Sequence, residues 1–230
     1  MTLVLFDIDG TLLQTGGAGS TAMRRAGEKL FGVPDLFAGR SFAGIVDDGI
    51  VSGAMAAAGI PPTPRRLGRF KRCYLRLLRR HIHEHPGRVM PGAHAAVAAC
   101  AERALVGLQT GNWRVGAETK LAHFGLWRPF SRGIGGFGCD ASVRPGLIPA
   151  ALRRARRHGW AGGRVIVVGD TPADVACARQ GVALWTGSAV ELLTVAVDTG
   201  VPSRCALEAS SPDLLVDDLH VGLERLLDLL

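Results

Sequence analysis

The sequence predicts an α/β fold in which a parallel sheet carries helices on both faces. Short apolar runs, typical of buried strands, alternate along the chain with stretches whose apolar residues recur at helical spacing. Strands are expected at residues 3–6, 105–108, 164–168, 182–185 and 213–216. Helices are expected at residues 93–103, 116–124, 149–158 and 173–180. Because strands and helices alternate, we expect a Rossmann-like core with a parallel sheet.

Residues 15–90 interrupt this alternation. They contain no convincing buried strand, and from Leu67 to Ile82 apolar side chains recur at helical spacing with arginines on the opposite face. Glycine and proline pairs stand at both ends of the region, where they favour breaks in the regular structure. We therefore predict a helical cap at residues 15–90, inserted after the first strand of an α/β core that comprises residues 1–14 and 91–230.

The composition indicates a folded, water-soluble chain. Of its 230 residues, 47% are hydrophobic and 20% are charged, which supplies a core and excludes a disordered tail protein. No apolar run reaches the ~18 residues of a membrane span. The first nine residues hold two carboxylates, whereas a secretory signal needs a basic start and a longer apolar stretch. We therefore expect a cytoplasmic location and no membrane association.

The formal net charge of +7 is distributed unevenly. The segment from Arg65 to Arg88 holds eight arginines and one lysine against a single acid, Glu84. Such a patch fits a phosphorylated small molecule, a nucleic acid or a membrane surface, but a run of charges is more often a solvated helix face. We favour the solvated face and predict no specific nucleic-acid binding.

Two carboxylates follow the first predicted strand directly. Asp7 and Asp9 stand at the carboxyl end of that strand, the edge where α/β sheets bind ligands, and Gly10 allows a sharp turn. A plain acidic turn is the alternative interpretation. These carboxylates are the first candidates for a functional site.

A second strand end carries a polar tripeptide. Thr110, Gly111 and Asn112 follow the strand at residues 105–108 and stand at the entrance of a predicted helix. A hydroxyl and exposed backbone N–H groups at a helix entrance suit an anion, although the same tripeptide also makes an ordinary turn.

A third strand end carries two more acids. Asp170 follows the strand at residues 164–168, and Asp174 lies four residues further on, near the first helical turn. Together with Asp7 they could form a carboxylate cluster for Mg²⁺, a hard cation that prefers oxygen ligands. The alternative is a helix cap in which an acid favours the helix dipole.

A site built from these groups needs a cation near the anion it binds. Arg144, in the loop before a predicted helix, and Lys120, within a predicted helix, are the candidates. For each the alternative is a solvated surface base. The sequence leaves open which of the two fills the cationic role.

Together these residues resemble the motifs of the haloacid dehalogenase superfamily. Asp7-x-Asp9-Gly10-Thr11 is similar to its first motif, Thr110 to its second, and Asp170 with Asp174 to its fourth. The order and the spacing also match, and the interval between the first two motifs leaves room for a helical cap. The Thr-Gly-Asn form of the second motif is most similar to phosphoglycolate-phosphatase-like members.

The chain departs from the family pattern in two places. The third motif usually presents a lysine, but none follows Lys120, and Arg144 takes that place by order. Arginine stays charged and grips phosphate oxygens bidentately, so the exchange is compatible with activity. In the cap, residues 39–42 read Gly-Arg-Ser-Phe where relatives often have a Gly-Arg-Thr-Asp-like stretch.

The resemblance implies roles for each candidate. Asp7 would be the nucleophile and Asp9 the general acid and base. Mg²⁺ would be held by Asp7, the backbone carbonyl of Asp9 and Asp170, with Asp174 supporting it. The phosphoryl oxygens would be bound by residues of the second and third motifs, namely Thr110, Gly111, Asn112 and Arg144.

The function expected from the resemblance is hydrolysis of a small phosphorylated metabolite by a Mg²⁺-dependent phosphomonoesterase with an aspartyl-phosphate intermediate. A phosphomutase that uses the same intermediate is one alternative. A non-catalytic binding module with a basic cap is another, although the intact carboxylates argue against it.

Overall fold

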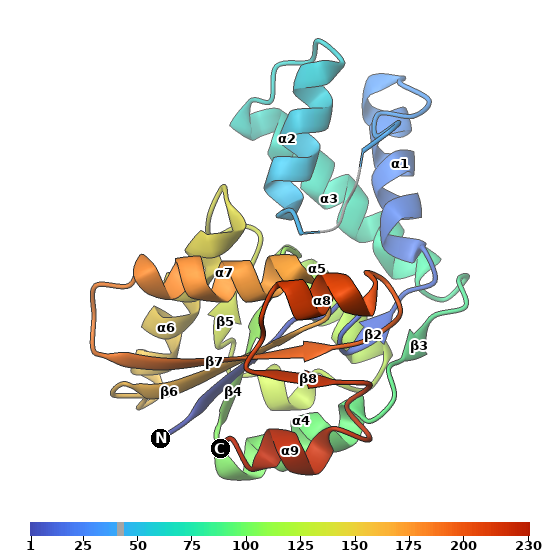
Figure 1. Ribbon diagram of the computed structural model, residues 1–230. Helices are drawn as coiled ribbons and strands as arrows, with labels where there is room; N and C mark the ends of the chain where they lie inside the picture. Colours follow the sequence, from blue (N-terminus) through green and yellow to red (C-terminus); the bar gives the residue numbers. More distant parts are fainter. Residues whose placement is uncertain (41–43) are drawn as a thin grey trace.

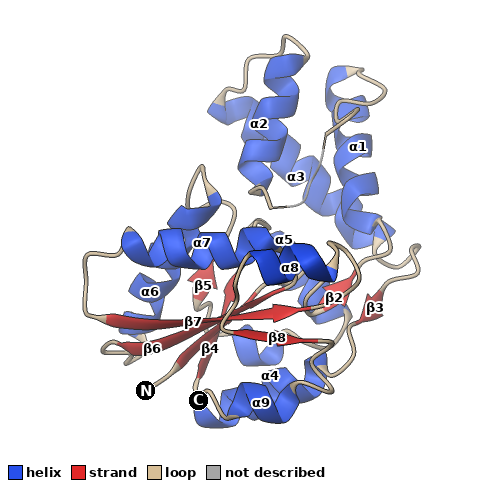
Figure 2. Ribbon diagram, viewed as in Figure 1, coloured by secondary structure: helices blue, strands red, loops and turns tan. Residues whose placement is uncertain are grey.

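The computed structural model describes residues 1–40 and 44–230. Within these residues six parallel strands form the central sheet, in the order β5-β4-β1-β6-β7-β8 (Figures 1 and 2). The strands are β1 (Leu3–Phe6), β4 (Leu105–Gln109), β5 (Gly135–Gly136), β6 (Gly163–Gly169), β7 (Val190–Val197) and β8 (Leu214–Val216). The predicted fold class, an α/β core with a parallel sheet, is confirmed.

Strand β1 lies inside the sheet because all four of its residues are apolar and buried. Alternate side chains of a strand point to opposite faces. Val4 and Phe6 pack in one apolar cluster, and Leu3 and Leu5 pack in another on the opposite face. Helices therefore cover both faces of the sheet: α4 (Ala93–Arg103), α5 (Arg114–His123) and α9 (Leu223–Leu227) on one, α6 (Leu147–Arg157) and α7 (Pro172–Ala183) on the other.

The register of β1 brings three chain segments to one edge of the sheet. Phe6 is aligned with Leu108 of β4 and with Val168 of β6. Because all three strands run in the same direction, the residues that follow them emerge side by side at the carboxyl edge. The polar strand-end residues that the sequence singled out therefore meet there.

Three helices stand apart from the sheet as a cap: α1 (Ala18–Phe31), α2 (Asp47–Ala57) and α3 (Pro64–His81) (Figure 1). Helix α3 begins with Thr63 as its N-cap and Pro64 in its first turn, and it buries Phe70, Tyr74 and Leu78 at a spacing of four residues. Two chain crossings join this cap to the core, and they pair as the antiparallel strands β2 (Leu13–Gln14) and β3 (Arg88–Val89). The division at residues 15 and 90 stays a prediction.

The expected strand at residues 182–185 is wrong. Val182 and Ala183 are the last residues of α7, and the next strand is β7. The apolar run belongs to the final helical turn, where Val182 packs against the sheet, and Trp185 then donates its indole N–H to the carbonyl of Ser188 (2.9 Å) in the connection. Residues 196–211 contain the end of β7 and helix α8 (Arg204–Ala209).

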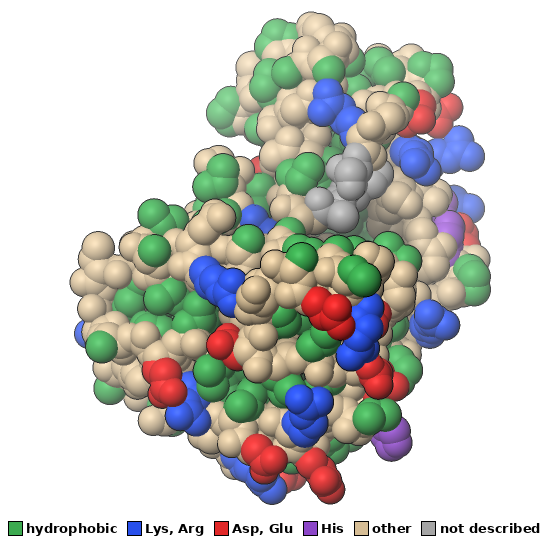
Figure 3. Space-filling view, in the orientation of Figure 1, with side chains coloured by type: hydrophobic (Ala, Val, Ile, Leu, Met, Phe, Trp, Pro, Cys, Tyr) green, Lys and Arg blue, Asp and Glu red, His purple; other side chains and the backbone are tan. Residues whose placement is uncertain are grey.

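Two short 3₁₀ turns complete the described elements, Arg128–Phe130 and Arg144–Gly146. No helix of the described chain combines the length and apolarity that crossing a membrane requires. Arginines line the solvent side of α3, and on the face of the molecule in Figure 3 basic and acidic side chains are mixed over the core. The absence of specific nucleic-acid binding remains a prediction.

Candidate active site

A cavity of about 730 Å³ lies between the carboxyl edge of the sheet and the cap. The strand ends β1, β4 and β6 form its floor, and residues of α1, α2 and α3 contribute from the cap side. All the sequence-predicted candidates except Asp174 line it, namely Asp7, Asp9, Thr110, Gly111, Asn112, Lys120, Arg144 and Asp170. The structure therefore brings together residues from four distant segments.

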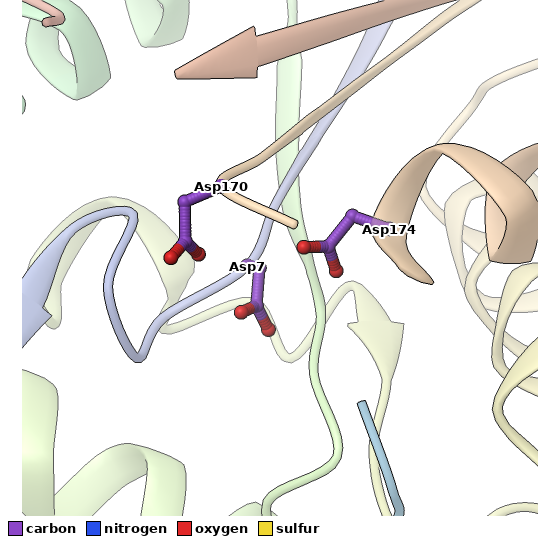
Figure 4. Close-up of side chains that lie close together, drawn as sticks. All are labelled: Asp7, Asp170 and Asp174. Carbon is purple, nitrogen blue, oxygen red and sulfur yellow. The ribbon is translucent and has the colours of Figure 1, made fainter. Parts of the chain in front are cut away.

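Three carboxylates converge on the floor of the cavity. Asp7 comes from the end of β1, Asp170 from the end of β6 and Asp174 from the first turn of α7 (Figure 4). One oxygen of each lies within 4.8 Å of the others, and all three side chains are buried. Carboxylate oxygens at this separation are the donor set that Mg²⁺ prefers.

Burial makes this cluster electrostatically strained. Burial raises the pKa of Asp7 well above its ordinary value; Arg144 acts in the opposite direction, and the nearby carboxylates raise the pKa further. Burial together with the charge of Asp174 also raises the pKa of Asp170 to about 7. A bound divalent cation would remove this repulsion, so the residues fit a Mg²⁺ site.

Hydrogen bonds hold two of these carboxylates in place. Thr11 Oγ1 donates to Asp170 Oδ1 (2.8 Å), and Thr199 Oγ1 donates to Asp170 Oδ2 (3.3 Å). Asp174 Oδ2 accepts from the backbone N–H (3.0 Å) and the hydroxyl (2.7 Å) of Thr171 in a capping box. The carboxylate of Asp174 thus already accepts hydrogen bonds from the start of its own helix and forms an ion pair with a cation. Asp7 and Asp170 are therefore better placed to be direct ligands of a metal ion.

That cation is Arg144. Its Nη2 lies 3.2 Å from Asp7 Oδ1 and forms a short ion pair with Asp174. The two carboxylates raise the pKa of the guanidinium against the opposing effect of burial. Its Nε is buried and has no hydrogen-bond partner among the described residues. The structure therefore places Arg144, and not Lys120, beside Asp7.

Lys120 takes a different place in the cavity. Its Nζ lies 2.7 Å from both carboxylate oxygens of Asp9 and 2.7 Å from Asn112 Oδ1. Asn112 Nδ2 in turn donates to Asp9 Oδ2 (2.7 Å) and to Thr110 Oγ1 (2.8 Å). Burial alone would raise the pKa of Asp9, but Lys120 and Asn112 outweigh it and lower that pKa. The network favours the ionised form of Asp9, which is not part of the three-carboxylate cluster.

Trp113 connects the cap to the core through packing and hydrogen bonds. This residue directly follows Asn112, yet its fully buried ring packs in the apolar cluster of the cap, 5.3 Å from Tyr74 and 6.5 Å from Phe70 between ring centroids. Its backbone N–H donates to Asp47 Oδ2 (2.8 Å), and its indole N–H donates to Asp48 Oδ1 (2.9 Å).

Sequence reasoning missed several groups at this site. Thr199 lies just after β7, so the same strand-end rule would have found it if β7 had been placed correctly. Asp47 lines the cavity from the start of α2, and its backbone N–H donates to the carbonyl of Gly111 (2.8 Å). No sequence pattern singles out this contact between cap and core. The stretch at residues 39–42 differs from the Gly-Arg-Thr-Asp-like stretch of relatives, and its residues 41 and 42 lie outside the described residues.

Solved structures show the same fold. A hydrolase from Pseudomonas syringae aligns with a TM-score of 0.68 at 18% identity, covering 99% of each chain. A predicted phosphoglycolate phosphatase from Haemophilus somnus 129pt aligns with a TM-score of 0.62 at 19% identity, covering 98% of this chain and 97% of its own. A putative beta-phosphoglucomutase from Thermotoga maritima aligns with a TM-score of 0.59 at 21% identity over the full length of both chains.

Family models give the classification. The model for haloacid dehalogenase-like hydrolases matches residues 4–179, and a second, described as HAD-hydrolase-like, matches residues 144–221. No curated protein matches the chain significantly. The first match spans most of the chain, including Asp7, Thr110 and Asp170 at the three strand ends. With that match and this fold, the chain belongs to the haloacid dehalogenase-like hydrolase family.

Proposed function

We propose that the protein is a Mg²⁺-dependent phosphomonoester hydrolase that acts on a small phosphorylated metabolite through an aspartyl-phosphate. One observation carries the proposal: the buried carboxylate of Asp7 faces the cavity with Asp170 and Arg144 beside it. A carboxylate so placed has a metal site on one side and a cation on the other. Both are needed when an anion attacks a phosphoryl group.

In the first step a carboxylate oxygen of Asp7 forms a bond to phosphorus, and the bond from phosphorus to the ester oxygen breaks. Asp9, in its protonated form, gives its proton to that leaving oxygen. In the second step water attacks the phosphorus of the aspartyl-phosphate, Asp9 takes a proton from the water, and Asp7 is released as a carboxylate. The pairing of Asp9 with Lys120 favours the ionised form that this second step needs.

The metal would be held by Asp7, Asp170 and the backbone carbonyl of Asp9. When bound, Mg²⁺ would neutralise charge on the carboxylate and the phosphoryl oxygens. Arg144 has a buried Nε that finds no partner among the described residues, and Thr110 lines the same cavity together with Gly111 and Asn112. These groups would bind the remaining phosphoryl oxygens.

The experiment is a steady-state assay of 4-nitrophenyl phosphate hydrolysis with and without Mg²⁺. We expect turnover that requires the metal, and a loss of several orders of magnitude in D7N, on the order of what removing a covalent nucleophile costs. Activity of D7N within about tenfold of the parent would contradict the proposal. Circular dichroism of D7N checks that the variant is folded.

A phosphomutase is the second candidate, favoured by the likeness to a putative beta-phosphoglucomutase. A mutase shares the aspartyl-phosphate but returns the phosphoryl group to a sugar, and the cap contributes residues that could limit the access of water. Release of inorganic phosphate from hexose phosphates supports the hydrolase, whereas formation of an isomeric hexose phosphate without net release supports the mutase.

A further inference from the structure

The charges around the cavity are unbalanced. Its described lining has four carboxylates, against two cations, Lys120 and Arg144; the carboxylates are Asp7, Asp9, Asp47 and Asp170. Residues 41–43, which the structure does not describe, are Ser, Phe and Ala, so they carry no charged side chain. A bound divalent cation on the floor would offset the two excess negative charges of the lining as a whole, but Asp47 would still face the substrate from the cap.

Neither cation is free to receive a second anion. Lys120 Nζ has three partners at 2.7 Å, which are both oxygens of Asp9 and Asn112 Oδ1, so all its N–H donors are used. Arg144 lies between Asp7 and Asp174 on the floor, where the proposed phosphoryl group binds. A carboxylate or a second phosphate on the leaving group would find no unpaired cation among the described lining residues.

The cap side instead offers hydrogen-bonding groups and a negative charge. Asp47 is 7% exposed and lines the cavity; its Oδ2 accepts from the N–H of Trp113, and its Oδ1 has no hydrogen-bond partner among the described residues. Ser20, Gln14 and Tyr74 also line the cavity, as do the apolar side chains of Met23 and Ile50. A buried acceptor of this kind favours a donor and disfavours an anion.

We propose that Asp47 is a specificity-determining residue, an inference that rests on the proposed phosphatase function. Asp47 selects phosphomonoesters whose leaving group carries hydroxyl or ammonium donors and no second anionic group. The free Oδ1 accepts a hydrogen bond from such a donor. A leaving group with a carboxylate meets like charge instead, and this cost grows in a cavity partly shielded from water. Phosphoglycolate is accordingly a poor substrate, although a structural neighbour is named for it.

Three two-carbon esters of matched size test the inference: phosphoglycolate, 2-hydroxyethyl phosphate and 2-aminoethyl phosphate. In each, the leaving oxygen is bonded to a CH₂ group, and this CH₂ group carries a carboxylate, a hydroxymethyl group or an aminomethyl group in its ammonium form. With saturating Mg²⁺ at about pH 8, where Asp47 is ionised, we expect kcat/KM for phosphoglycolate to be about tenfold or more below both other esters. An equal or higher kcat/KM for phosphoglycolate overturns the inference.

A pair of variants assigns the effect to Asp47. D47N removes the negative charge, so kcat/KM for phosphoglycolate relative to 2-hydroxyethyl phosphate should rise several-fold. D48N is the matched control, because it removes a carboxylate from the same first turn of α2 and from the same tryptophan without lining the cavity. An unchanged ratio in D47N, or an equal rise in D48N, contradicts the assignment.

A parallel assay with 4-nitrophenyl phosphate separates the two proposals. If the wild-type protein hydrolyses the aryl ester but prefers phosphoglycolate among the three two-carbon esters, the specificity inference is wrong and the phosphatase proposal stands. If the protein hydrolyses none of the four esters with Mg²⁺, the phosphatase proposal fails, and the inference that rests on it fails with it.

Discussion

Arg144 and Asp7 meet at the carboxyl edge of the sheet, with 3.2 Å between Nη2 and Oδ1 and with side chains that are only 10% and 9% exposed. The same guanidinium also pairs with Asp174, which the capping box of α7 holds in place. The arginine is thus fixed from both sides. The structure thus places Arg144 beside Asp7, whereas Lys120 is paired with Asp9; that Arg144 fills the cationic role stays a prediction.

Replacing Arg144 should therefore impair catalysis strongly. In R144M the phosphoryl oxygens lose a charged donor, and we expect kcat/KM to fall by ~10²–10³-fold, the usual effect of losing one such donor. R144K keeps the charge without the planar guanidinium and should recover part of the rate. Kinetics of both variants with an aryl phosphate measure this difference. An R144M enzyme as active as R144K would show that the positive charge is not used.

Removal of the metal should abolish turnover reversibly. A chelator leaves Asp7 and Asp170 without a divalent cation between them, and added Mg²⁺ should restore the rate. D170A should weaken the dependence of rate on Mg²⁺ concentration as well as the rate itself. Ca²⁺ should inhibit, because its larger and looser coordination shell positions the reacting groups poorly. Full activity in excess chelator would rule out the metal site.

Trp113 should stabilise the whole molecule, because its ring is buried in the cap although it follows the strand-end loop of the core. W113A should lower the free energy of unfolding by about 3–5 kcal/mol, as large-to-small changes in cores do. W113F keeps most of the ring contact and loses the hydrogen bond to Asp48, so a smaller loss of about 1 kcal/mol is expected. Urea unfolding measures both values, and equal stability of W113A and wild type would contradict this packing.

Asp47 should make the stability depend on pH. Burial raises its pKa from 3.8 to about 7, with Lys120 acting in the opposite direction. The folded state therefore holds a proton that the unfolded state releases, so the stabilising contribution is complete below about pH 4 and is lost as the pH rises through 7. The difference amounts to at most about 4 kcal/mol.

The variant D47N removes this dependence. Relative to wild type, it should gain stability between about pH 5 and pH 8, and D48N serves as the control for charge at the start of α2. Thermal unfolding across that pH range tests the sign. A D47N protein that is destabilised equally at both pH values would show that ionised Asp47 is not strained by burial.

The sequence sufficed for much of the fold because its strongest signals are local. The apolar run of β1 and the acids that follow β1 and β6 depend on short-range patterns, and the strand-end rule then places Asp7 and Asp170 together. The run at residues 182–185 misled the same reasoning, since four apolar residues fit a helix end as well as a strand. Because β7 was misplaced, Thr199 was missed at the very edge where it contacts Asp170.

Contacts between cap and core were not predictable from sequence. Asp47 is distant in sequence from Gly111 and Trp113, and only the docking of α2 onto the strand-end loop brings them together. The choice between Arg144 and Lys120 likewise depends on where each side chain ends in space. Lys120 is buried and the side chain of Arg144 is only 10% exposed, and each lies beside a carboxylate, so neither composition nor spacing distinguishes them.

The most direct test of Asp7 as the nucleophile is to find the phosphoryl group on it. D9N lacks the group that accepts a proton from the attacking water, whereas a 4-nitrophenolate leaving group departs without taking a proton. The aspartyl-phosphate should therefore accumulate when this variant is mixed with 4-nitrophenyl phosphate and Mg²⁺. After acid quenching and digestion, mass spectrometry should locate one phosphoryl group on Asp7, and the double variant D7N/D9N should carry none. A phosphoryl group on another residue, or phosphate release by D7N at the wild-type rate, would contradict the assignment.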